Sequence, residues 1–113
     1  MADPRLKKLT ISCNVVKRIA KEKKNYEEEF RKETQKYEEK VAQNIEEHDL
    51  RMAKAILDES KMIIPDCQMR LDKALVDLNN LIQECEGELA ETEQFKEAKS
   101  TYLSYSHTED QLN

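Results

Sequence analysis

Apolar side chains recur at every seventh position through the middle of the chain, and this spacing is what most constrains the fold. The first set runs from residue 50 to residue 85: Leu50, Leu57, Ile64, Leu71, Leu78 and Cys85. An interleaved set is small or apolar throughout: Ala53, Ser60, Cys67, Ala74 and Leu81. Two interleaved sets sustained over five heptads are typical of the a and d positions of a coiled coil. The pattern predicts one long helix that buries a continuous stripe against partner helices.

A proline, Pro65, lies inside this heptad pattern. It lacks the N–H that would bond to the carbonyl of Lys61, and its ring crowds that turn of the helix. The apolar positions nevertheless stay in step from Leu57 through Ile64 to Leu71, whereas a helix that stopped and restarted would usually lose its register. We therefore predict a single helix that is bent at Pro65.

The composition favours long helices over a compact globule. The chain has 113 residues, which allows at most one domain, 1–113. Apolar residues make up 38% of it and charged residues another 38%, so either disorder or helices with narrow apolar stripes fit. One glycine and two prolines in the whole chain favour the helices.

Three helices follow from the periodicity, and their bounds are about 9–46, about 49–86 and about 88–106, with a flexible polar tail at 107–113. Residues 5–12 either start the first helix or lie extended, and Thr10 or Ser12 is its candidate N-cap. Asp49 is the predicted N-cap of the second helix, and Gly87 its predicted left-handed C-cap. Because the connections are short, the fold class is all-α: an elongated antiparallel three-helix bundle or coiled coil, up-down-up.

The third helix is too short to cover the other two. It would be about 29 Å long, against roughly 55 Å for each of the first two. Half of the groove between the long helices would then be a two-helix hairpin with part of its apolar stripe uncovered, near Phe30, Tyr37, Val41, Leu50 and Ile56. Either another protein or a second copy of the chain would cover it, so the sequence is compatible with a monomer or a homodimer.

The two ends of the chain carry opposite charges, within a net charge of −5. Residues 1–24 hold eight Lys/Arg against two acids, whereas residues 84–113 hold two Lys against eight acids. The up-down-up order would place the acidic start of the third helix beside the basic start of the first. The two blocks either neutralise one another or leave a basic face for an acidic partner. An acidic chain with one basic end is a poor candidate for binding nucleic acid.

The sequence offers no arrangement of residues typical of catalysis or of a bound cofactor. The three cysteines, Cys13, Cys67 and Cys85, have no C-x-x-C spacing, and His48 and His107 do not form an H-x-x-x-H pair, so no metal site is expected. A single glycine excludes a phosphate-binding glycine loop. We expect a non-enzymatic helical interaction protein. The polar opening and the lack of a long apolar run suggest a cytoplasmic protein with reduced thiols and no membrane span.

Several short sequence motifs resemble those of one protein family. They are Met1-Ala-Asp-Pro-Arg5, Val15-Val-Lys-Arg-Ile-Ala-Lys-Glu-Lys23, Tyr26-Glu and above all Glu59-Ser-Lys-Met-Ile-Ile-Pro-Asp-Cys-Gln-Met-Arg-Leu71. These motifs, together with Phe95-Lys-Glu-Ala-Lys99, resemble tubulin-specific chaperone A, also called tubulin-folding cofactor A. The resemblance covers nearly the full length and the same three-segment layout. The segment around 42–48 departs from it, since it lacks the glycine that some relatives carry, and the tail after 105 follows no family pattern.

The resemblance implies a small cytoplasmic, cytoskeleton-associated cochaperone without cofactors. It would capture β-tubulin after release from the cytosolic chaperonin, before other tubulin-folding cofactors assemble it with α-tubulin. Mapped onto the matching positions, the expected partner contacts are Lys17, Arg18, Lys21, Glu22 and Tyr26 in the first helix, and Glu59, Met62, Pro65, Asp66 and Arg70 in the second. The alternative is a generic coiled-coil adapter or structural tether without tubulin specificity.

Overall fold

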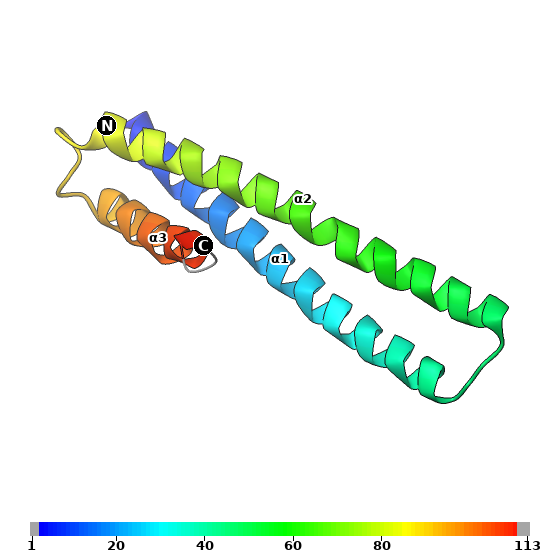
Figure 1. Cartoon of the computed structure of the whole chain (residues 1–113). Helices are drawn as coiled ribbons and strands as arrows, with labels where there is room; N and C mark the ends of the chain where they lie inside the picture. Colours follow the sequence, from blue (N-terminus) through cyan, green and yellow to red (C-terminus); the bar gives the residue numbers. More distant parts are fainter. Residues whose placement is uncertain (1–2, 111–113) are drawn as a thin grey trace. The chain divides into compact units, whose positions relative to one another are not determined.

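The fold consists of three helices. A computed structural model describes residues 3–110, and the side chains of residues 3–106. The helices are α1 (Pro4–Ala42), α2 (Glu47–Cys85) and α3 (Glu93–Asp110), and residues 3–110 contain no strand (Figure 1). The predicted all-α class with two long helices and a shorter third is confirmed.

The helices divide into two compact units. One contains the described residues up to Ala20 and from Met69 onward, and the other contains Lys21–Gln68. We call the first the three-helix unit, because the start of α1, the end of α2 and the whole of α3 belong to it. We call the second the two-helix unit, since it contains only the end of α1 and the start of α2. These two helix segments run antiparallel and are connected by residues 43–46 (Figure 1). That residues 1–113 form a single domain stays a prediction.

The tightly packed core lies in the three-helix unit. All three helices and the segment before α3 contribute side chains to it: Leu9, Cys13, Val16, Ile19, Leu71, Ala74, Leu75, Leu78, Ile82, Cys85, Leu89, Phe95 and Ala98. The single buried polar side chain of the described residues, Thr101, lies on α3. Here α3 acts as the third wall that the apolar stripes of α1 and α2 require for burial.

The two-helix unit has a much smaller core. Its buried apolar residues are Ala53, Leu57 and Cys67. Of the five residues expected to be uncovered, Val41 and Ile56 are 49% and 50% exposed, and the other three are half-buried. Two helices alone cannot enclose a stripe from all sides, so the predicted partly uncovered hairpin is confirmed.

The heptad stripe of α2 faces inward as predicted. None of its eleven members is exposed: Leu50, Ala53, Leu57, Ser60, Ile64, Cys67, Leu71, Ala74, Leu78, Leu81 and Cys85 are buried or half-buried. Pro65 lies inside α2, which continues through it as one helix. The prediction of an uninterrupted helix is confirmed, and the bend at Pro65 stays a prediction.

The start of α1 lies before the predicted bound at about residue 9, and residues 5–12 are part of the helix, which is one of the two alternatives for them. The helix begins at Pro4, and the N–H of Arg5 donates to Oδ1 of Asp3 at 2.9 Å. Asp at the N-cap and Pro at the first helical position are both favoured, because the side chain accepts from a free N–H and proline has none to leave unpaired. Neither Thr10 nor Ser12 is therefore the N-cap; Thr10 lies within the helix and donates through Oγ1 to the carbonyl of Leu6.

The connection between α1 and α2, residues 43–46, is longer than the two residues predicted. α1 ends at Ala42 instead of 46, and Asn44 has a φ of 57°, the left-handed conformation that often follows a helix. Asparagine tolerates this conformation better than most residues, which explains how the turn forms without glycine. α2 begins at Glu47, so Asp49 is not its N-cap. Asp49 lies in the first turn, where a negative charge is favourable.

The second connection corrects two further predictions. α2 ends at Cys85, and Gly87 has no positive φ, so Gly87 is not a left-handed C-cap. α3 begins at Glu93 instead of 88, because Thr92 is its N-cap: the N–H of Phe95 donates to Oγ1 of Thr92 at 3.2 Å. The helix continues to Asp110, so 107–110 of the predicted flexible tail is helical, and 111–113 lie outside the described residues.

Candidate partner-binding surfaces

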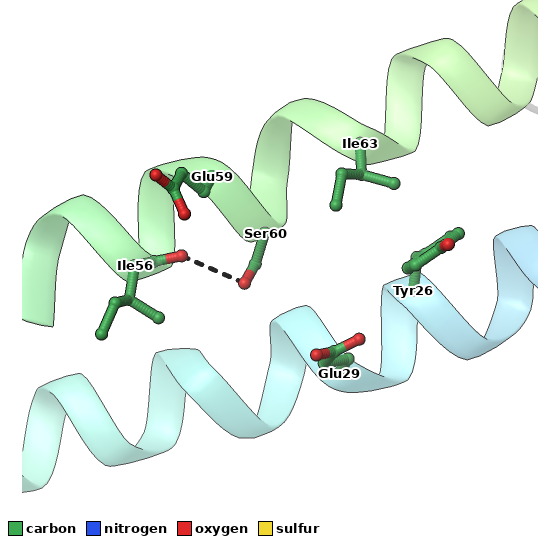
Figure 2. Close-up of a pocket in the computed structure, with 6 residues that line it drawn as sticks. All are labelled: Tyr26, Glu29, Ile56, Glu59, Ser60 and Ile63. Carbon is green, nitrogen blue, oxygen red and sulfur yellow. Dashed lines mark hydrogen bonds between the residues drawn. The ribbon is translucent and has the colours of Figure 1, made fainter.

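An open groove runs along the two-helix unit. Figure 2 shows its six lining residues, which are Tyr26 and Glu29 from α1 and Ile56, Glu59, Ser60 and Ile63 from α2. The groove has a volume of about 250 Å³, which is below the roughly 300 Å³ at which pockets for small-molecule ligands begin. Such a space is better suited to the side chains of another protein.

The floor of the groove is apolar and partly exposed. Ile56 is 50% exposed, Ile63 is 40% exposed, and Tyr26 is half-buried. The hydroxyl of Ser60 donates to the carbonyl of Ile56 at 3.1 Å, so its donor is satisfied within the helix (Figure 2). What remains open to a partner is mainly aromatic and aliphatic surface.

Two carboxylates flank this apolar surface, one on each helix. Glu29 and Glu59 are both exposed, and neither has a cation within salt-bridge distance among the described side chains.

Three other carboxylates of the two-helix unit, those of Glu28, Glu33 and Asp58, are paired with a cation of their own helix. The Arg31 guanidinium binds Glu28 and lowers the pKa of that carboxyl, and Lys54 lies 3.2 Å from Asp58. The two groove carboxylates therefore place negative charge beside the groove without an ion pair to a described side chain.

A second groove, in the three-helix unit, has a different charge. It is lined by Val15, Ile19, Arg70, Lys73, Ala74 and Asp77 and has a volume of about 240 Å³. Its rim carries two cations, Arg70 and Lys73, against one carboxylate. The two grooves thus present apolar surface with opposite flanking charge.

Two ion pairs join the start of α1 to the region around α3, so the charge blocks neutralise one another in part, which is one of the two alternatives that the sequence left open. Arg5 contacts Glu88 at 2.6 Å and Lys17 contacts Glu97 at 2.6 Å. The hydrogen bond from Lys17 to Glu97 raises the pKa of Lys17. Glu88, Lys17 and Glu97 are exposed and Arg5 is half-buried, and surface pairs of this kind contribute little to stability. Arg5 and Glu97 were not singled out from the sequence, because pairing depends on the register of α3.

The residues predicted to contact a partner do not form one cluster. Tyr26 and Glu59 lie together in the groove of the two-helix unit, and Arg70 lines the groove of the three-helix unit. Met62, Pro65 and Asp66 are exposed on α2 and line neither groove, with Met62 71% exposed.

The remaining predicted contacts lie on α1. Lys17 is held by Glu97, Lys21 is exposed, and Arg18 and Glu22 each have an interaction partner. Glu29 and Ile63 line the groove but were not predicted as site residues, whereas Ile56 was expected in the uncovered apolar stripe. Their spacing of three or four residues from Tyr26 and Glu59 is the signal that would have placed them on the same helix faces.

The three cysteines are packing residues of the interior. All are free and buried, and burial raises the pKa of the Cys13 and Cys85 thiols. The described residues contain no group of three or more His, Cys, Asp or Glu side chains that could hold a metal ion. Within the same residues, no helix combines the length and apolar character needed to cross a bilayer.

Comparison with known proteins gives a consistent result. The family model "Tubulin binding cofactor A" matches residues 4–102. Tubulin-specific chaperone A of Gallus gallus is 46% identical over 100 residues, covering 88% of this chain and 92% of the relative. The Homo sapiens protein of the same name is 43% identical over 99 residues, with 88% and 91% covered.

Solved structures extend the similarity to the fold. The crystal structure of tubulin folding cofactor A from Arabidopsis thaliana matches with a TM-score of 0.85 at 33% identity, covering 92% of this chain and 97% of that one. Human tubulin chaperone cofactor A matches with a TM-score of 0.77 at 38% identity, covering 91% and 99%. With a family model that matches almost the whole described chain and relatives above 40% identity, this chain belongs to the tubulin binding cofactor A family.

Proposed function

We propose that the chain is a non-enzymatic, cytoplasmic tubulin-folding cochaperone. It captures and stabilises β-tubulin after release from the cytosolic chaperonin, on the route to α/β-tubulin heterodimers. The observation that carries this proposal is the family match over residues 4–102, together with relatives named tubulin-specific chaperone A.

The surface of the chain supports a holding role. A partly folded client exposes apolar surface, and the two-helix unit presents a complementary one in Tyr26, Ile56 and Ile63. Methionines are also exposed on α2: Met52 and Met62 in the two-helix unit, and Met69 in the three-helix unit. Unbranched methionine side chains adapt to irregular surfaces, which suits reversible capture of a client without a fixed shape.

Retention of tubulin from cytosol tests the proposal directly. The full chain is immobilised and incubated with cytosol at low salt, and the bound α- and β-tubulin are quantified. We expect β-tubulin to be retained in excess over α-tubulin. If β-tubulin is not retained, the chaperone function is wrong for this chain.

The contribution of the basic start of α1 needs a separate test. Reversing Lys17 and Arg18 to Glu is expected to weaken client binding more than it lowers helicity. Because Lys17 pairs with Glu97, the charge-swapped double variant Lys17→Glu/Glu97→Lys serves as a control that can restore the pair. If the swap restores client binding fully, Lys17 acts through intramolecular pairing and not through the client.

The competing function is a coiled-coil adapter or tether, favoured by the heptad stripe and the exposed apolar positions of α2. An adapter would self-associate through this surface and show no preference for β-tubulin. Light scattering at several concentrations distinguishes the two, since a monomer leaves the surface of the two-helix unit free for a client, whereas a stable homodimer that covers it does not.

A further inference from the structure

The groove of the two-helix unit has a counterpart in the three-helix unit that shows how a helix can be held between α1 and α2. There, α3 inserts Phe95 and Ala98 into the core. It also places Glu97 against Lys17, with Nζ and Oε1 2.6 Å apart. A helix is thus bound by an apolar stripe at helical spacing plus an opposite charge beside the stripe.

The two-helix unit has the same two walls but lacks the third helix. Its apolar floor is half-exposed at Ile56 and Ile63, and its flanking charges are Glu29 on one wall and Glu59 on the other (Figure 2). The charge beside this groove is therefore the reverse of that beside α3: carboxylates here, a lysine there.

We propose that this groove binds an amphipathic helix whose apolar stripe is flanked by lysines or arginines, and that such a helix of the client occupies it. The inference rests on the proposed function and refines it, because it names the kind of client segment. The apolar stripe contacts Tyr26, Ile56 and Ile63, and the flanking cations pair with Glu29 and Glu59. An acidic helix like α3 is disfavoured, since its charge repels both carboxylates.

The small volume of the groove agrees with this occupant. About 250 Å³ accommodates individual side chains of a helix lying along the groove. Helix-in-groove recognition works in this way, through apolar anchors at i, i+3, i+4 and i+7. The two carboxylates then contribute orientation and partner choice more than affinity.

Peptide binding to the full chain tests the proposal. The probe is a fluorescein-labelled helical peptide with leucines at i, i+3, i+4 and i+7 flanked by lysines, and its match is the same peptide with glutamates in place of the lysines. We expect the basic peptide to bind at least about tenfold more tightly than the acidic one. Failure of the basic peptide to bind, or equal binding of both peptides, overturns the proposal.

Variants of the chain place the binding in this groove. Glu29→Lys/Glu59→Lys is expected to weaken basic-peptide binding about tenfold, whereas Glu38→Lys/Glu39→Lys, with the same change of net charge on exposed residues outside the groove, changes it less than about twofold. Ile56→Ser/Ile63→Ser is expected to weaken binding similarly, with Val76→Ser as its exposed control. Equal effects of groove and control variants overturn the proposal, and circular dichroism of each variant confirms that the helices are retained.

Retention of β-tubulin by the same variants separates this inference from the proposed function. If the wild-type chain retains β-tubulin and the groove variants retain it equally well, the inference is wrong and the function stands. If the basic peptide binds in the groove while no β-tubulin is retained, the proposed function is wrong. The preference of the groove for basic helices then remains, but β-tubulin is not their source. If the groove variants abolish self-association of the chain instead, a second copy is the occupant and the inference is wrong.

Discussion

Side chains are buried more completely in the three-helix unit than in the two-helix unit, and this difference predicts the relative effects of two matched substitutions. Leu78 is 0% exposed in the core of the three-helix unit, whereas Leu50, in the same helix and the same heptad position, is half-buried in the two-helix unit. Leu78→Ala removes a fully buried side chain and leaves a closed cavity, so we expect a loss of about 3–5 kcal/mol. At Leu50 water reaches the site and no closed cavity forms. We expect about 1 kcal/mol, roughly half the transfer free energy of a leucine.

Urea unfolding followed by far-ultraviolet circular dichroism measures both losses. A chain of 113 residues has a total stability of roughly 6–17 kcal/mol, so Leu78→Ala removes a large fraction and shifts the midpoint visibly. Both changes are Leu to Ala inside α2, so the difference in helix propensity cancels between them. Equal losses at the two positions would refute the reasoning, because they would mean that Leu50 is as enclosed as Leu78.

Three further predictions concern the helix ends and the thiols. Thr92→Ala should lower the free energy of unfolding by about 1 kcal/mol, because it removes the N-cap of α3, and thermal unfolding measures this loss. Thr92→Ser should retain most of the stability, since serine can also cap the helix. An unchanged stability in Thr92→Ala would contradict the assignment of Thr92 as the N-cap. Hydrogen bonds from Arg5 lower the pKa of Asp3 from its ordinary value of 3.8 to about 2, which an NMR titration of the carboxyl should show; Arg5→Gln should return it toward 3.8. Because this pKa is depressed, the stabilising contact is present above pH 3.8 and is lost as the pH falls toward 2. If Arg5→Gln leaves the pKa of Asp3 unchanged, Arg5 is not the cause of the shift. The buried thiols should react with a disulfide reagent far more slowly in the native chain than in urea, and one fast-reacting thiol in the native chain would show that its site opens readily.

The long helices were predictable because their signal is local and repeated. The apolar residues of each heptad of α2 lie on the same face of the helix, so one proline does not obscure the pattern. The helix continues through Pro65. The helix ends were less predictable, because one or two residues decide each of them. Asp3 before Pro4 lies outside the periodic stretch, and Gly87 suggested a C-cap that the backbone does not use.

The candidate site was predictable only in part. Resemblance led to Tyr26 and Glu59, and the structure places both in one groove. Glu29 completes the charge of that groove, but its role depends on the alignment of α1 against α2, which a single helix pattern does not report. The same reason applies to the charge blocks: the sequence left open whether they neutralise one another or leave a basic face, and the pairing of Lys17 with Glu97 required the true start of α3 at Glu93.

Hydrogen–deuterium exchange of the full chain, with and without bound β-tubulin, tests the central claim most directly. The claim is that the client binds the uncovered surface of the two-helix unit. We predict that bound β-tubulin slows amide exchange within Lys21–Gln68, most strongly around Tyr26 and over Ile56–Ile63, because a helix seated in the groove restricts opening of both walls. Protection confined to the three-helix unit, with unchanged exchange in Lys21–Gln68, would contradict the account.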